Sequence, residues 1–284
     1  MSDHIMLSPL GFHRIFHPTD FSQESEVAFA HALKLALVAR TEFTIMHTEA
    51  NKEDLDLQEF PQVRATLQRW KTPDDVGTGL KVKKVAAVAK SPSQGIIEYL
   101  AHHPTGLVVL STSQRDGLAR WSRDSVAEPL ARAANRRTLF IPAATGGFVS
   151  QEDGSVSLRS ILIPVAKSPD PQEAVNAAAL LAKAMNIEHI VFHFLHVGPS
   201  EQCPTPATPK QPGWAWNTIV TDGDIVERIH EQSAACQADL IVMVTEGHKT
   251  FSSMLGGSTT EHVVRGASCP VLALPAIAAD AAEA

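Results

Sequence analysis

The sequence predicts an α/β protein made of two tandem domains, each a doubly wound, five-stranded parallel sheet. Short apolar segments alternate with amphipathic helical segments, which indicates parallel strands with helices on both faces of a sheet. The order of segments in the first half recurs in the second. Leu110 and Met243, and likewise Pro142 and Pro275, are separated by 133 residues. These observations together indicate a duplicated domain.

Each predicted copy opens with a short apolar strand that ends in proline, at residues 14–18 and 160–164. A polar turn and a long helix rich in Ala and Leu follow in both copies, with apolar residues at helical spacing. In the second copy Asp170 and Pro171 begin this helix, because a capping side chain followed by proline is typical of a helix start.

Four further strands are expected in each copy. They are predicted at 43–48, 82–88, 107–110 and 138–142 in the first copy, and at 190–197, 216–220, 240–243 and 271–275 in the second. Right-handed crossovers between such strands make a doubly wound sheet the natural topology. The polar segments 49–79 and 198–213 are predicted to be irregular surface loops, with a lid or a partner surface as the alternative.

The domain limits follow from these elements. We assign residues 10–143 to the first domain and 159–276 to the second, with a linker hairpin over 144–158 and an Ala-rich tail over 277–284. Each copy leaves its last strand as an unpaired edge, so we expect the two copies to form a pseudo-two-fold pair within the chain. We expect one sheet per copy, since a single sheet running through both halves would argue against duplication. Further homodimerisation is allowed and not required.

Composition excludes several classes of protein. The 284 residues are 44% hydrophobic, as in globular proteins, and no apolar run approaches the roughly 20 residues that span a bilayer. The net charge is −7 and the basic residues are scattered, which argues against a nucleic-acid partner. The start at Met1 has no signal-peptide pattern, so a cytoplasmic protein without membrane contact is expected. Three cysteines without a CxxC pair and thirteen histidines without an HExxH motif predict neither disulfides nor a metal site.

The predicted topology also locates a candidate ligand site. Ligands of doubly wound sheets bind outside the carboxyl ends of the strands, where the strand order reverses. After the fourth strand of the second copy, nine residues separate Gly247 from Gly257 and Ser258, which open a short helix. Glycines let the backbone approach an anion, and a helix start supplies unpaired N–H groups. This segment therefore predicts a phosphate cradle, with a helix start that needs small residues only for packing as the alternative.

Several motifs, which follow one another in the expected order along the chain, resemble those of the universal stress protein (UspA-like) family in its tandem two-domain form. They are Pro18-Thr19-Asp20-Phe21-Ser22, His47, His196-Val197, 238–243, Gly257-Ser258 and Cys269-Pro270-Val271. The resemblance covers nearly the whole chain. It implies Rossmann-like domains of the adenine-nucleotide alpha hydrolase-like type, pairing of domains and, in one subclass, ATP binding. That subclass has an Asp after the first strand and a G-x2-G-x9-G-(S/T) motif after the fourth.

The resemblance implies a nucleotide site in the second copy only. Its residues would be Gly247, His248, Gly257, Ser258, Thr259, Val165, Val197 and Met243. This copy departs from the pattern at Val244, which replaces the first glycine, and at Ala166, which replaces the acid.

The first copy keeps a residual site of Thr19, Asp20 and Ser125. It carries Ser111, Gln114 and Asp124 where the motif has glycines. Because Asp124 would place a negative charge beside a phosphate, we expect this copy not to bind ATP in the usual way.

The functional hypothesis is a stress-response regulator that binds ATP or a related phosphate ligand in its second domain, with no metal except magnesium carried by the nucleotide. Nucleotide bound in the second domain would alter the arrangement of the two domains, or a surface for a protein partner that the sequence does not identify. A ligand-free structural or interaction module, with both sites decayed, is the alternative. Glu246 and His248 could act as acid and base, but the chain has no nucleophile elbow or P-loop, so at most slow ATP hydrolysis is expected.

Overall fold

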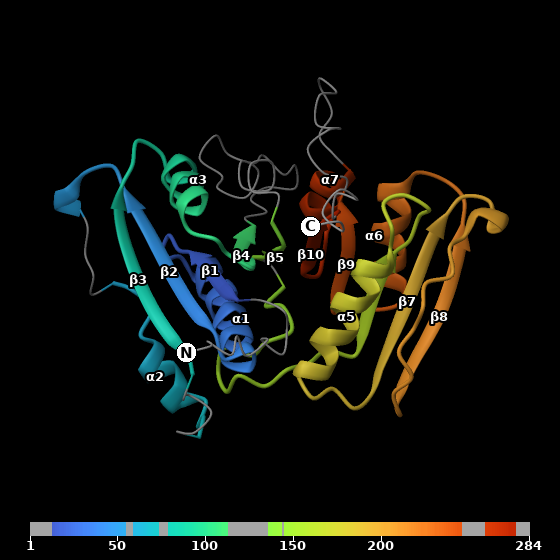
Figure 1. The fold of residues 1–284 in the computed structure, drawn as a ribbon, viewed down its shortest axis with the longest axis horizontal. Coiled ribbons are helices and arrows are strands. Elements are labelled where there is room, and N and C mark those ends of the chain that lie inside the picture. Colours follow the sequence, from blue (N-terminus) through green and yellow to red (C-terminus); the bar gives the residue numbers. More distant parts are fainter. Residues whose placement is uncertain are drawn as a thin grey trace, which may run out of the picture.

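The computed structural model describes residues 13–54, 59–73, 79–112, 136–143, 145–245 and 259–276 (Figure 1). The strands are β1 (Arg14–Pro18), β2 (Glu42–Glu49), β3 (Lys81–Val88), β4 (Leu107–Thr112), β5 (Thr138–Pro142), β6 (Ser160–Pro164), β7 (Ile190–Val197), β8 (Trp214–Thr221), β9 (Leu240–Thr245) and β10 (Val271–Pro275). The helices are α1 (Gln23–Ala39), α2 (Val63–Arg69), α3 (Pro92–His102), α5 (Gln172–Ala184), α6 (Ile225–Ala235) and α7 (Thr259–Gly266), with short 3-10 turns at Lys52–Asp54 and Ser200–Gln202.

All ten strands belong to one sheet, in the order β3-β2-β1-β4-β5-β10-β9-β6-β7-β8. The expectation of two separate sheets is therefore wrong. Within each half the strands are parallel, and the halves meet where β10 pairs antiparallel with β5. The duplication itself is retained, because each half has its strands in the order third, second, first, fourth, fifth from its outer edge inward. The two last strands cover each other's edges, which is why the sheet becomes continuous.

Helices cover both faces of this sheet (Figure 1). Residues of α1 and α5 share one buried cluster, and residues of α3, α6 and α7 share a second cluster on the other face. Each cluster contains residues from both halves of the chain, so the two copies share their cores. Across the junction Arg137 donates to Glu173 on α5, with 3.4 Å between guanidinium and carboxylate.

Local chemistry explains the longest helix. The Ser22 side chain caps α1 by accepting a hydrogen bond from the Ser25 N–H at 3.2 Å. Arg40 follows the helix in the left-handed conformation, where its backbone N–H bonds to the carbonyls of Ala36 and Leu37. Most of the Ala and Leu residues of α1 are buried, since the helix lies between the sheet and the linker.

The linker forms the predicted hairpin, in which Val149 pairs antiparallel with Val156. Two side chains of the first copy hold it. His31 accepts hydrogen bonds from the backbone N–H groups of Phe148 and Val149, and the Trp70 indole donates to the Gln151 carbonyl at 3.0 Å. The connection between the copies is thus packed against the first copy.

The polar segments after the second strands differ between the copies. In the first copy the prediction of an irregular loop is wrong in part, because α2 forms there and Phe60 and Trp70 are buried beside it. In the second copy, residues 203–213 have no helix or strand and are tied to α5 by reciprocal hydrogen bonds between Gln172 and Ala207, at 2.8 and 3.0 Å. No helix in the described ranges is both long enough and apolar enough to cross a bilayer.

Candidate functional site

Each copy has a place where two neighbouring parallel strands separate. The ladder between β1 and β4 contains only the pairs Ile15–Leu107 and Phe16–Val108, and the ladder between β6 and β9 only Ile161–Leu240 and Leu162–Ile241. By contrast, β6 pairs with β7 over all five of its residues. These openings lie at the carboxyl ends of the first and fourth strands of each copy, where ligands bind in doubly wound sheets.

The same pair of hydrogen bonds holds the loop after the first strand in both copies. In the first copy Thr19 donates its N–H to the Met46 carbonyl at 2.8 Å, and His47 Nδ1 lies 2.7 Å from the Thr19 carbonyl. In the second copy Val165 donates its N–H to the Leu195 carbonyl at 2.8 Å, and His196 Nδ1 lies 3.1 Å from the Val165 carbonyl. Because a carbonyl only accepts, each of these two bonds is donated by Nδ1 of the histidine. Both loops are therefore fixed relative to the second strand.

The structure places the predicted residues of the second copy on two sides of the sheet. Val165 is buried in the cluster that contains α5, whereas Met243 and Val197 belong to the cluster on the opposite face. Thr259 is exposed at the first position of α7. Four predicted residues lie outside the described part of the chain: Gly247, His248, Gly257 and Ser258.

The two residues that depart from the nucleotide-binding motif, Ala166 and Val244, both lie within the described part of the chain. Ala166 is exposed after β6, so no side chain there can accept a hydrogen bond from a sugar hydroxyl. Val244 is half-buried and packs against the cluster that contains α5. Lys167, the residue after Ala166, is exposed and brings a positive charge to this loop.

Helix α7 lies between β9 and β10 in the chain, and because these strands are parallel it returns the chain from the carboxyl end of β9 to the start of β10. Val263 and Val264 anchor it in the core, and the Val263 carbonyl lies 3.0 Å from His230 Nε2. A Cβ added at Gly266 would lie 2.4 Å from the His230 ring, so this close packing of α6 and α7 requires glycine.

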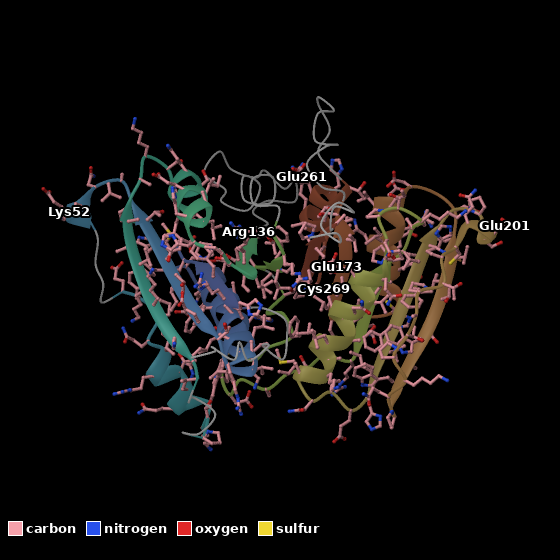
Figure 2. The ribbon with its side chains drawn as sticks, viewed as in Figure 1. Lys52, Arg136, Glu173, Glu201, Glu261 and Cys269 are labelled. Atoms are coloured by element: carbon pink, nitrogen blue, oxygen red, sulfur yellow. The ribbon has the colours of Figure 1, made fainter. Side chains whose placement is uncertain are left out.

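Glu261 is a residue of this region that the sequence analysis missed. It lies in the first turn of α7 and is only 3% exposed (Figure 2). An acidic side chain is favourable at a helix N-terminus. The pattern Ser258-x-x-Glu261 is that of a capping box, and this signal was available in the sequence.

In the first copy, polar side chains of the loop after β1 form hydrogen bonds within that loop. Asp20 Oδ1 accepts hydrogen bonds from the Ser22 hydroxyl at 2.6 Å and from the Ser22 N–H at 3.1 Å. Thr19 Oγ1 accepts from the Phe21 N–H at 3.1 Å. Phe21 has φ 61° and stacks on His47 with 4.1 Å between ring centroids. Ser125, the third predicted residue, lies outside the described residues.

His17 is a second residue that the sequence analysis missed. It is fully buried at the end of β1, and its Nδ1 donates to the Val109 carbonyl of β4 at 3.0 Å. Its Nε2 is buried and has no hydrogen-bond partner among the described residues. Burial lowers the pKa of His17 from 6.5 to about 4, so the ring is neutral. The equivalent position in the second copy is Ile163, which makes this a feature of the first copy only.

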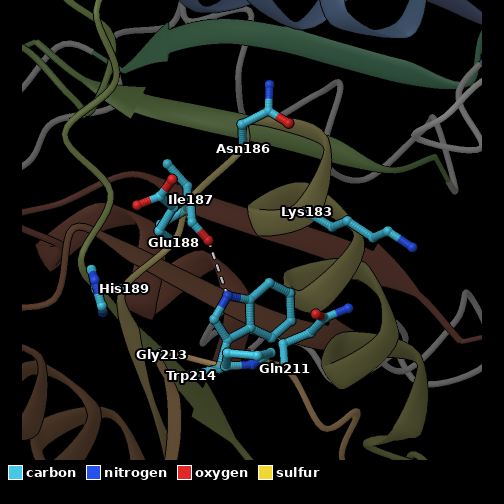
Figure 3. Close-up of a pocket in the computed structure, with 9 residues that line it drawn as sticks. Lys183, Asn186, Ile187, Glu188, His189, Gln211, Gly213 and Trp214 are labelled. Atoms are coloured by element: carbon cyan, nitrogen blue, oxygen red, sulfur yellow. Dashed lines mark hydrogen bonds between the residues drawn. The ribbon is translucent and has the colours of Figure 1, made fainter.

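The described surface is also hollowed at the opposite edge of the second copy (Figure 3). A cavity of about 520 Å³ lies at the amino ends of β7 and β8, lined by Lys183, Asn186, His189, Gln211 and Trp214 among others. The Trp214 indole is fixed there by a 3.0 Å hydrogen bond to the Ile187 carbonyl. This hollow is remote from the predicted site, and no motif pointed to it. In the described ranges no three His, Cys, Asp or Glu side chains are grouped so as to hold a metal ion.

Comparisons with known proteins agree with this architecture. The model of the Universal stress protein family matches residues 11–142 and 207–275. Among curated protein sequences, none matches the chain.

Solved structures of similar fold cover nearly the whole chain. A universal stress protein from Archaeoglobus fulgidus DSM 4304 is 15% identical, with a TM-score of 0.60, over 93% of this chain and 99% of the other. A putative universal stress protein from Pseudomonas aeruginosa UCBPP-PA14 is 17% identical, with a TM-score of 0.62, over 94% of each chain. A functionally unknown protein from Pseudomonas aeruginosa PAO1 is 16% identical, with a TM-score of 0.61, over 94% of each chain. The family match over both halves and the duplicated strand order lead to one conclusion: the chain belongs to the universal stress protein family.

Proposed function

We propose that this protein is a regulator whose second copy binds ATP or a related phosphate-bearing nucleotide in the opening between β6 and β9. The observations that support the proposal are the short ladder between β6 and β9 and helix α7 after β9, with Thr259 exposed at its first position. Gly257 and Ser258 directly precede it in the sequence. Backbone N–H groups at a helix start favour an anion.

The difference between the copies supports the second as the binding copy. In the first copy, Phe21 covers one face of His47 and Asp20 is engaged by Ser22. In the second copy, the position of Phe21 is taken by Lys167, which is exposed. A lysine at this loop suits a phosphate group, whereas in the first copy Thr19 and Asp20 accept hydrogen bonds from their own loop.

Two observations favour the alternative of a ligand-free interaction module. Ala166 lacks the acceptor that the ATP-binding subclass uses, and a lost hydrogen bond of this kind weakens binding by about 1–2 kcal/mol. Glu261 is buried at the start of α7, where it can satisfy N–H groups that a phosphate would otherwise take. The calorimetric experiment below separates the two functions.

The experiment is a calorimetric titration of the full chain with ATP and magnesium. We expect one nucleotide per chain, with binding abolished in Gly257→Asp and the melting temperature unchanged. Asp20→Ala in the first copy is the matched control and should bind as the unmodified protein does. If the unmodified protein shows neither heat nor thermal stabilisation, the ligand-free module is favoured. Loss of binding in Asp20→Ala would instead place the site in the first copy.

Turnover and cellular role are further parts of the proposal. Magnesium would enter with the nucleotide, and at most slow hydrolysis is expected, which phosphate release over hours would measure. We propose that the protein acts in the cytoplasm and that nucleotide occupancy is read by a protein partner through the arrangement of the two copies.

A further inference from the structure

The two outer edges of the ten-stranded sheet differ in charge. β3, at one edge, carries Lys81, Lys83 and Lys84 within eight residues. β8, at the other edge, has the sequence WAWNTIVT over eight residues and no charged side chain. Lysines on an edge strand prevent another strand from pairing with it, because pairing would bury their charge. The β3 edge therefore has this protection, and the β8 edge lacks it.

The backbone of β8 presents unpaired groups on its outer side. The carbonyls of Gly213 and Thr221 accept hydrogen bonds from the N–H groups of Ile190 and Gly198, at 3.2 and 2.8 Å. In a parallel ladder alternate residues face the neighbouring strand, so Trp216, Thr218 and Val220 direct their N–H and C=O groups away from β7. Within the described ranges none of these groups has a backbone partner.

The β8 edge is also in part apolar, and two of its aromatic side chains pack on Phe192. Trp216 stacks on Phe192 with 4.0 Å between ring centroids and an interplanar angle of 9°, and Trp214 lies 5.3 Å from the same ring. Val220 is 43% exposed near the end of the strand. A strand whose side chains are already packed loses less conformational freedom when another strand pairs with it.

From these observations we propose that β8 pairs antiparallel with β8 of a second copy of this chain, extending the sheet across a two-fold axis. The chain already joins two equivalent edge strands in this way, where β5 pairs with β10. Pairing of β8 with β3 of another chain would form an open filament, and the lysines of β3 oppose it. Antiparallel pairing also brings exposed Lys210, before β8, toward exposed Asp222 of the other chain, after β8.

The test is the mass of the full chain in solution, measured by light scattering during gel filtration at micromolar concentration. We expect twice the 30.6 kDa of one chain. Thr218→Pro should give the mass of one chain, because proline removes an outward N–H and no bond to β7. The matched control is Val82→Pro in β3, which also removes an outward N–H and should leave the dimer intact.

A second pair of variants keeps the test decisive if proline prevents folding, which circular dichroism would show. Val220→Lys gives β8 the kind of charge that β3 carries and should halve the mass, whereas Val82→Lys should leave it unchanged. Three results would overturn the proposal: a monomeric unmodified protein, a dimer that persists in both Thr218→Pro and Val220→Lys, or a dimer that dissociates in the β3 variants.

Discussion

His31 in α1 accepts a hydrogen bond through Nε2 from the backbone N–H of Phe148, 117 residues later, at 2.9 Å. The same nitrogen lies 3.1 Å from the Val149 N–H, and Nδ1 donates to the Val27 carbonyl at 2.8 Å. The ring edge also contacts Phe148, with 4.7 Å between centroids. One neutral imidazole thus holds the linker hairpin that leads into the second copy.

Acid should release this contact. Burial lowers the pKa of His31 from 6.5 to about 4. The contribution of the neutral ring to folding stability is therefore complete above about pH 6.5, declines as the pH falls, and is lost below about pH 4. His17 behaves in the same way, and each pKa shift changes the free energy of unfolding by about 3 kcal/mol. The measurement is the free energy of unfolding in urea from pH 7 to 4. His31→Gln keeps an acceptor and should have a shallower slope, while an equal slope would show that His31 does not titrate on unfolding.

Substitution of Gly147 should disturb the same contact sterically. Its φ is +70°, and an added Cβ would lie 2.3 Å from His31 Nε2. We expect Gly147→Ala to reduce the free energy of unfolding by about 3 kcal/mol. Gly146→Ala is the matched control, because φ there is +66° but nothing lies within 4 Å. It should cost only about 1 kcal/mol of backbone strain. Equal losses in the two variants would contradict a specific contact with His31.

The shared cores predict one unfolding transition for the whole chain. Both hydrophobic clusters contain residues of both copies, and the linker residues Phe148, Val149 and Leu158 lie within one of them. Neither copy can unfold without exposing apolar surface of the other. Scanning calorimetry should therefore give a van't Hoff enthalpy equal to the calorimetric enthalpy. Two separate transitions would show that the copies unfold independently.

The three cysteines should react with alkylating agents in a defined order. Burial raises the pKa of the Cys269 thiol to about 12, with smaller contributions from Asp239 and Cys236, and burial also raises the pKa of Cys236. The thiolate is the reactive form, so Cys269 should be unmodified by iodoacetamide at mildly alkaline pH in the native protein. Mass spectrometry should show Cys203 modified first and all three modified after denaturation. Rapid native labelling of Cys269 would argue against its burial.

Much of this architecture could be predicted because the signals are local. The apolar run at 160–164 coincides with β6, and the proline that ends it is visible in the sequence. The short helix α2 could not be predicted, because it has seven residues and depends on the burial of Phe60 and Trp70 beside it. The continuous sheet depends on the relative orientation of the copies, for which no local pattern exists.

The candidate site could be predicted only in part. The strand order locates the openings, and the His47 and His196 contacts recur as the duplication requires. The burial of His17 depends on tertiary packing and has no sequence signal, whereas the capping-box pattern with Ser258 could have identified Glu261. The glycine-rich segment before α7 is a prediction that only ligand binding can test.

The most direct test of the central claim, a nucleotide site in the second copy, is photo-crosslinking with an azido-ATP analogue followed by peptide mapping. Labelling should fall on peptides from residues 240–266 and should be removed by competing ATP. Labelling confined to residues 107–142, or labelling that ATP does not compete, would contradict it.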